Sequence, residues 1–216
     1  MKLFKIVVAV ALLAAGAAQA GLNFVTTGNG KRTESFNSIA GLPTIPKNTN
    51  VLLGGLFANT AGTVTYTYLG NESGYTNQFL TVSGTTMLLE SSSIGSHVNK
   101  TVAAPGYLDF KFNETKNGNV VSYAVNGGFW STGTSIGLIG TSMKVHSGNA
   151  KGSYAYIIGF NDHAGNNKSL GDWDDFVVGV NFTAAAPVPE PETYAMLLAG
   201  LGLMGFIARR RKTNAA

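Results

Sequence analysis

The stretch Ser153-Tyr-Ala-Tyr-Ile-Ile-Gly-Phe160 decides the fold class of this chain. Large apolar side chains recur at every second position, so that Tyr154, Tyr156, Ile158 and Phe160 share one face. A period of two is the spacing of a β-strand that is buried on one side. Similar runs occur at residues 51–58, 63–69, 85–90, 107–112, 120–125 and 176–182.

Turn-forming residues separate these runs, at residues 70–74, 117–119, 126–128 and 165–167. Glycine and asparagine tolerate the positive φ that tight turns require. No run of ten or more interior residues carries a helical period. We therefore expect an all-β domain, an antiparallel β-sandwich of jelly-roll-like type, with a flattened β-barrel as the second choice.

The N-terminus has the three parts of a secretory signal peptide. A basic start, Met1 to Lys5, precedes an apolar run over residues 6–15, and Ala18-Gln-Ala20 supplies small residues for cleavage. We expect signal peptidase to remove residues 1–20 and the mature chain to begin at Gly21.

The C-terminus has a matching set of parts, beginning with Val188, Pro189, Glu190 and Pro191. The two prolines favour extended backbone that is open to an enzyme. Residues 194–208 carry no charge, and as a helix they cover roughly 22 Å, less than the roughly 30 Å of a bilayer core. We expect a short transmembrane helix, held by a cytoplasmic basic stop of Arg209, Arg210, Arg211 and Lys212.

This C-terminus resembles the PEP-CTERM sorting signal, which exosortase-type transpeptidases process in many Gram-negative bacteria. The resemblance implies an exported protein with an inner-membrane intermediate and a final place at the cell surface or outside the cell. It divides the chain into a signal peptide (1–20), a β-sandwich domain (21–187) and a sorting segment (188–212). Proteins with this signal are commonly associated with exopolysaccharide and biofilm.

Charge and cysteine content exclude several functions. Six of the fifteen Lys and Arg and two of the eleven acids lie in the terminal segments, which leaves nine of each in the interior. The interior is therefore neutral, and the basic pI of the chain gives no support for nucleic-acid binding. The chain has no cysteine, which excludes thiol catalysis and thiolate metal sites.

Catalytic motifs are sparse. Gly133-Thr-Ser135-Ile-Gly137 matches the nucleophile elbow G-x-S-x-G, but a helix should follow the serine and Leu138-Ile-Gly does not begin one. The histidines His97, His146 and His163 lack metal-binding spacing. We therefore expect no enzymatic activity.

The candidate site is the segment between the last two predicted strands, residues 161–175. It carries Asn161, Asp162, Asp172, Asp174 and Asp175, and only Lys168 offers a nearby positive charge. Calcium takes such oxygen ligands, and clustered carboxylates destabilise a fold unless a cation neutralises them. The segment also resembles an acidic strand-loop-strand motif of exported PEP-CTERM domains. We predict a calcium site, the alternative being that the acids form Asx-turns or face solvent.

Three function classes remain open: a surface or matrix protein associated with exopolysaccharide, a calcium-dependent carbohydrate-binding module, and a secreted hydrolase. The first is our main expectation. Ice binding is a smaller possibility, because Thr63, Thr65 and Thr67 form only one short stripe.

Overall fold

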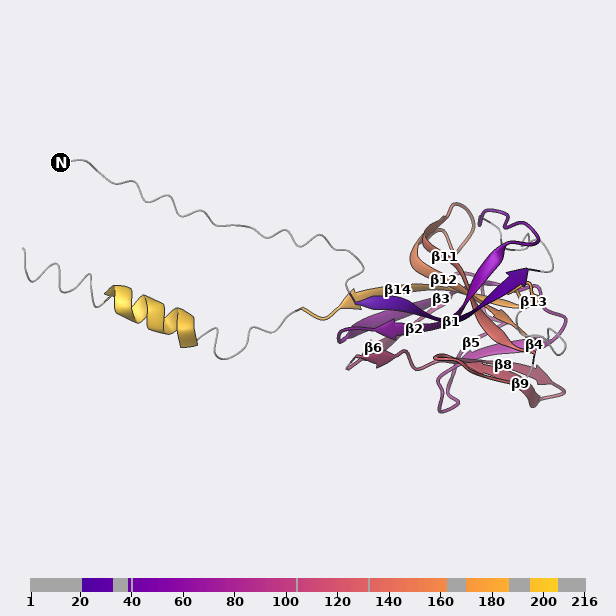
Figure 1. The fold of residues 1–216 in the computed structure, drawn as a ribbon, viewed down its shortest axis with the longest axis horizontal. Coiled ribbons are helices and arrows are strands. Elements are labelled where there is room, and N and C mark those ends of the chain that lie inside the picture. The colour runs from indigo at the N-terminus through magenta and orange to yellow at the C-terminus, as the bar shows by residue number, and fades with distance from the viewer. Residues whose placement is uncertain are drawn as a thin grey trace, which may run out of the picture. The chain divides into compact units, whose positions relative to one another are not determined.

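The computed structural model describes residues 21–32, 39, 41–103, 105–131, 133–162, 170–186 and 195–205. The chain divides into two compact units, Met1–Ala184 and Ala185–Ala216. The described part of the first unit is built from fourteen strands in two sheets, almost all paired antiparallel. The all-β, two-sheet prediction is confirmed (Figure 1).

The larger sheet has nine strands in the order β13-β1-β2-β11-β12-β14-β3-β6, with β7 also paired to β2. Its only parallel pair among the described residues is β1 with β13. The bounds are β1 Leu22–Arg32, β2 Asn50–Ala58, β3 Gly62–Gly70, β6 His97–Val102, β7 Gly106–Tyr107, β11 Ser135–Val145, β12 Gly152–Asn161, β13 Leu170–Gly171 and β14 Phe176–Ala184.

The smaller sheet has five strands in the order β10-β9-β8-β4-β5 and lies below the larger one in Figure 1. Its bounds are β4 Thr76–Leu80, β5 Thr86–Leu89, β8 Lys111–Lys116, β9 Asn119–Val125 and β10 Phe129–Trp130.

One apolar core joins the two sheets. It takes alternate residues of β12, namely Tyr156, Ile158 and Phe160, as the sequence predicts, and packs them against Phe79 and Phe112 of the smaller sheet. The Phe112 and Phe160 rings stack with centroids 5.1 Å apart. Because each large apolar side chain contributes roughly 1.5–3 kcal/mol when fully buried, this layer holds the sheets together.

Two of the predicted strands differ in detail from the sequence prediction. The expected strand over residues 107–112 is interrupted: β7 ends at Tyr107 and β8 begins at Lys111. Leu108 and Phe110 are nevertheless buried, and the Phe110 amide bonds the Leu108 carbonyl at 3.0 Å. Tyr154, expected in the core with Tyr156, instead joins a second apolar cluster with Ile157 and Val177.

The chain enters and leaves the domain at the same end. The Gly21 carbonyl accepts a 2.7 Å hydrogen bond from the Asn59 amide, just past the end of β2. A Cβ on Gly21 would lie 2.4 Å from the ring of Phe182, near the end of β14. The opposite end, where β1, β3 and β12 finish and β14 begins, carries the acidic residues of the candidate site.

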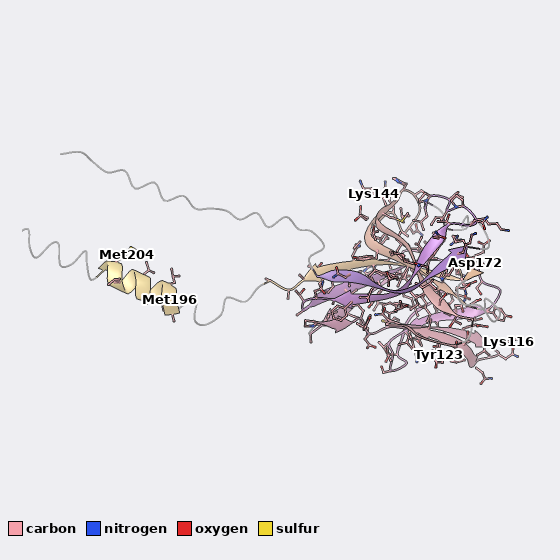
Figure 2. The ribbon with its side chains drawn as sticks, in the orientation of Figure 1. Lys116, Tyr123, Lys144, Asp172, Met196 and Met204 are labelled. Atoms are coloured by element: carbon pink, nitrogen blue, oxygen red, sulfur yellow. The ribbon has the colours of Figure 1, made fainter. Side chains whose placement is uncertain are left out.

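The second unit contains a helix over residues 195–205. Met196 and Met204 lie near its two ends and are 75% and 64% exposed (Figure 2). Among the residues that the structure describes, none of the helices has the length and apolar character needed to cross a membrane.

Candidate metal site at the acidic end of the domain

The candidate segment joins two neighbouring antiparallel strands. Phe160 at the end of β12 pairs with Phe176 at the start of β14. This register brings Asp162 and Asp175 together, and the Asp162 amide donates a 2.7 Å hydrogen bond to Asp175 Oδ2. The two residues are 5% and 9% exposed, so both carboxyl groups lie largely away from water.

Side chains from the smaller sheet extend this pair into a buried polar network. Asn77 on β4 donates from Nδ2 to Asp162 Oδ2 at 2.9 Å and to the Asp175 carbonyl at 3.3 Å. The Ser73 hydroxyl also donates to Asp162 Oδ2. On β9, the Ser122 hydroxyl lies 3.2 Å from the Asp162 carbonyl and donates to the buried Glu114 carboxylate.

The other two predicted acids lie beside an arginine from the opposite end of the sequence. Arg32, the last residue of β1, approaches Asp174 with 3.6 Å between Nη2 and Oδ2 and donates from Nη1 to the Asp172 carbonyl. The side chains of Arg32 and Asp174 are 0% and 4% exposed. Lys168 is the one Lys or Arg within the segment and lies outside the described residues, but the fold supplies Arg32 from a distant part of the sequence.

Burial changes the protonation of both neighbouring aspartates. Desolvation, with the Asp172 charge second, raises the pKa of Asp174 to about 7, although Arg32 opposes the rise. Desolvation, followed by the charges of Asp162 and Asp172, raises the pKa of Asp175 to about 9. Burial also lowers the pKa of the Arg32 guanidinium, which stays protonated at neutral pH.

Trp173, which lies between Asp172 and Asp174 in the chain, anchors the segment to the larger sheet. Its backbone has a φ of 58° and its side chain is fully buried. The ring occupies space that glycines leave open: a Cβ on Gly30 or Gly137 would lie 2.5 Å or 2.6 Å from it. A buried tryptophan of this kind is a packing anchor, and its ring is not available to stack on a sugar.

The G-x-S-x-G motif belongs to the same anchor. Ser135 begins strand β11 and is fully buried, and its Oγ accepts a 2.9 Å hydrogen bond from Trp173 Nε1. The serine therefore does not occupy the exposed strand-to-helix turn of a nucleophile elbow. His97 and His146 are exposed, and His163 lies outside the described residues.

Asn161 also has a structural partner, since its Nδ2 donates to the Gly133 carbonyl at 3.0 Å. The five predicted ligands are thus divided: Asp162 with Asp175, Asp172 and Asp174 with Arg32, and Asn161 with Gly133. Within the described ranges, no three Asp, Glu, His or Cys side chains already form a metal centre. Calcium binding stays a prediction.

Four partners of these acids could not be found from the sequence. Ser73, Asn77 and Ser122 reach the site from the smaller sheet or the loop before it, and Arg32 reaches it from β1. Strand β4, which carries Asn77, has only one strongly apolar pair, Phe79-Leu80, and gave no strand signal.

An open hollow lies next to this network, lined by the loop before β4 and the turn between β8 and β9. It has a volume of about 530 Å³, and its lining residues are Gly74, Tyr75, Thr76, Thr115, Lys116 and Asn117. The Lys116 ammonium lies 5.9 Å from the centroid of the Tyr75 ring. The Ser73 hydroxyl that donates to Asp162 accepts a 2.8 Å hydrogen bond from the Tyr75 amide, so the hollow and the network share a loop.

The fold and site define an all-β domain of two sheets, with buried acids at the end opposite its entry and exit points, followed by a separate helical C-terminal unit. The PEP-CTERM protein-sorting motif matches residues 187–212, which include the predicted motif and basic stop. Neither a curated protein nor a solved structure matches the chain. Because the chain carries this motif, it is an exosortase-sorted protein exported to the cell envelope or surface. Val188–Pro191 and Arg209–Lys212 themselves lie outside the described residues.

Proposed function

We propose that this chain is a non-enzymatic protein of the cell surface or extracellular matrix that associates with exopolysaccharide. In this proposal signal peptidase releases the chain before Gly21, the β domain extends to residue 187, and the C-terminal segment holds an inner-membrane intermediate until exosortase acts. The sorting motif supports delivery to the cell envelope or surface. The observation that carries the saccharide contact is the hollow around Tyr75 and Lys116.

The hollow offers the groups that a sugar ring uses. Tyr75 is 38% exposed and presents an aromatic surface to the apolar face of a ring. Thr76 and Asn117 beside it offer a hydroxyl and an amide group for sugar hydroxyls. The Lys116 ammonium adds a partner for a carboxylate, so an acidic polysaccharide fits better than a neutral one.

Co-sedimentation of the full chain, in detergent, with purified exopolysaccharides tests this proposal. We expect an acidic polysaccharide to carry the protein into the pellet, and Tyr75→Ala and Lys116→Gln each to weaken binding about tenfold. Tyr107→Ala is the matched aromatic control because Tyr107 is 45% exposed on the larger sheet. Lys144→Gln on β11 is the charge control, since Lys144 and Lys116 lie in different parts of the domain (Figure 2).

If no polysaccharide carries the protein down, or if the hollow variants bind as well as the controls, the saccharide function is wrong. A calcium-dependent carbohydrate-binding module is the second candidate. The loop shared by Tyr75 and Ser73 favours it, because an ion beside Asp162 would also fix one wall of the hollow. It differs from the first candidate in predicting that a chelator abolishes co-sedimentation.

A further inference from the structure

Among the residues that the structure describes, the buried hydrogen-bond network around Asp162 contains no Lys or Arg. Asp162, Asp175 and Glu90 lie close enough for Asp162 to raise the pKa of each of the other two. Among the described residues, none of these three carboxyl groups forms an ion pair, because Arg32 is committed to the Asp174 side. Burying carboxylates without a cation costs several kcal/mol for each ion.

Two buried oxygen atoms of the same network also lack a hydrogen-bond donor among the described residues. Asn77 is fully buried, and although its Nδ2 donates to Asp162, its Oδ1 has no partner. Glu90 Oε1 is likewise a buried oxygen without a donor. Because Asn77 Oδ1 is bonded to the same carbon as Nδ2, it lies within the network. Buried polar atoms are rarely left without a partner, so two oxygens of one network without donors indicate that a hydrogen-bond donor or a cation completes it.

Buried carboxylate and amide oxygens without a described cation are ligands that a hard metal ion accepts. We propose that one calcium ion binds in this network, held by oxygens of Asn77, Glu90, Asp162 and Asp175. Calcium accepts carboxylate, amide and carbonyl oxygens in irregular arrangements of six to eight, whereas magnesium demands near-octahedral geometry. In the described part of the chain no three acids already form a metal centre, so binding requires these side chains to move closer together.

This ligand set differs from the one that the sequence predicts. Asp162 and Asp175 belong to both sets, but Asn77 and Glu90 replace Asn161, Asp172 and Asp174. The reason is that Asp174 already has Arg32 as its cation, while Asn161 bonds the Gly133 carbonyl. The two sets can therefore be told apart by single substitutions.

The test is calorimetric titration of the full chain with calcium chloride, together with thermal unfolding in calcium or EDTA. We expect one ion per chain and a Tm about 5–10 °C higher when calcium is at a hundred times its Kd. Glu90→Gln and Asp162→Asn should abolish both signals. Glu72→Gln is the control, because Glu72 is an exposed acid of the same loop as Ser73.

Three outcomes overturn the proposal. Superimposable melting curves in calcium and EDTA exclude the ion, and an equal Tm rise with magnesium excludes the assignment to calcium. If calcium binding is lost in Asp174→Asn but not in Glu90→Gln, the site lies at Asp172 and Asp174, beside Arg32, and not in the network around Asp162. Should Asp162→Asn fail to fold, the half-buried Glu90 still supplies the decisive variant. None of these measurements involves saccharide, so they stand apart from the test of the proposed function.

Discussion

Asp174 and Asp175 are adjacent in the chain, yet the structure gives them opposite surroundings. Asp174 lies beside the guanidinium of Arg32, while Asp175 accepts a backbone amide and belongs to a network with no described cation of its own. The pKa of Asp174 rises to about 7 and that of Asp175 to about 9. The difference shows that a dense run of acids in a sequence need not be one site, because each side chain is neutralised by whatever the fold places next to it.

The largest effect should come from removing the arginine. Arg32→Met leaves Asp174 buried without its cation, and we expect the free energy of unfolding to fall by about 3–5 kcal/mol in urea denaturation. The double variant Arg32→Met, Asp174→Leu should recover much of the loss because the unpaired charge is gone.

Lys31→Met is the matched control, since Lys31 is exposed on the same strand and should change stability little. If Arg32→Met lowers the free energy of unfolding no more than Lys31→Met does, the ion pair of Arg32 with Asp174 is not significant. The contrast drawn between Asp174 and Asp175 would then be wrong.

The pH dependence of stability should separate the two aspartates in metal-free buffer. Both pKa values are raised on folding, so each contribution is fully present below about pH 4 and is lost as the pH rises through the folded-state pKa. That loss is complete near pH 7 for Asp174 and near pH 9 for Asp175. Each carboxyl group lowers the free energy of unfolding by at most about 1.4 kcal/mol for each unit by which the pH rises in this range.

Urea denaturation between pH 4 and pH 9 measures these slopes. Asp175→Asn should remove most of the decline between pH 7 and pH 9, whereas Asp174→Asn should reduce it only below pH 7. An Asp175→Asn profile that still falls steeply above pH 7 would show that another group titrates there.

A smaller effect on stability should follow from disturbing Trp173, which lies between Asp172 and Asp174, the two acids beside Arg32. In Gly137→Ala the new methyl group would lie 2.6 Å from the indole and 2.8 Å from Val51, so we expect a loss of about 1–3 kcal/mol. Gly28→Ala is the control because a methyl group at that position would have no other atom within 4 Å. Calcium affinity by titration should be unchanged in both variants, and a Kd shift in Gly137→Ala alone would show that the two sides are coupled.

The sequence predicted burial better than it predicted strands. Alternation over residues 107–112 correctly marked Leu108, Phe110 and Phe112 as core, although the backbone turns between them. Strand β1 was missed because Thr26 to Gly30 has the composition of a loop. In the structure this stretch pairs with β2 through a bulge, and Gly30 is small because Trp173 packs on it.

The candidate site was predictable only in its local part. Asp162 and Asp175 could be placed together because a hairpin-like pairing of two adjacent predicted strands requires it. Arg32 precedes Asp172 by 140 residues, and Asn77 precedes Asp162 by 85. Contacts over such distances in sequence are set by the order of strands in the sheets, which no local pattern specifies.

The position of the domain's two ends has a mechanical consequence. Gly21 packs against Phe182, and β3 pairs with β14 up to Ala184, so the entry and exit of the chain lie side by side. Tension between the two ends would peel strands apart one hydrogen bond at a time instead of shearing a whole strand. A domain of this geometry unfolds at low force while both ends of the chain are tethered. Once either end has been cut, no force passes through the domain.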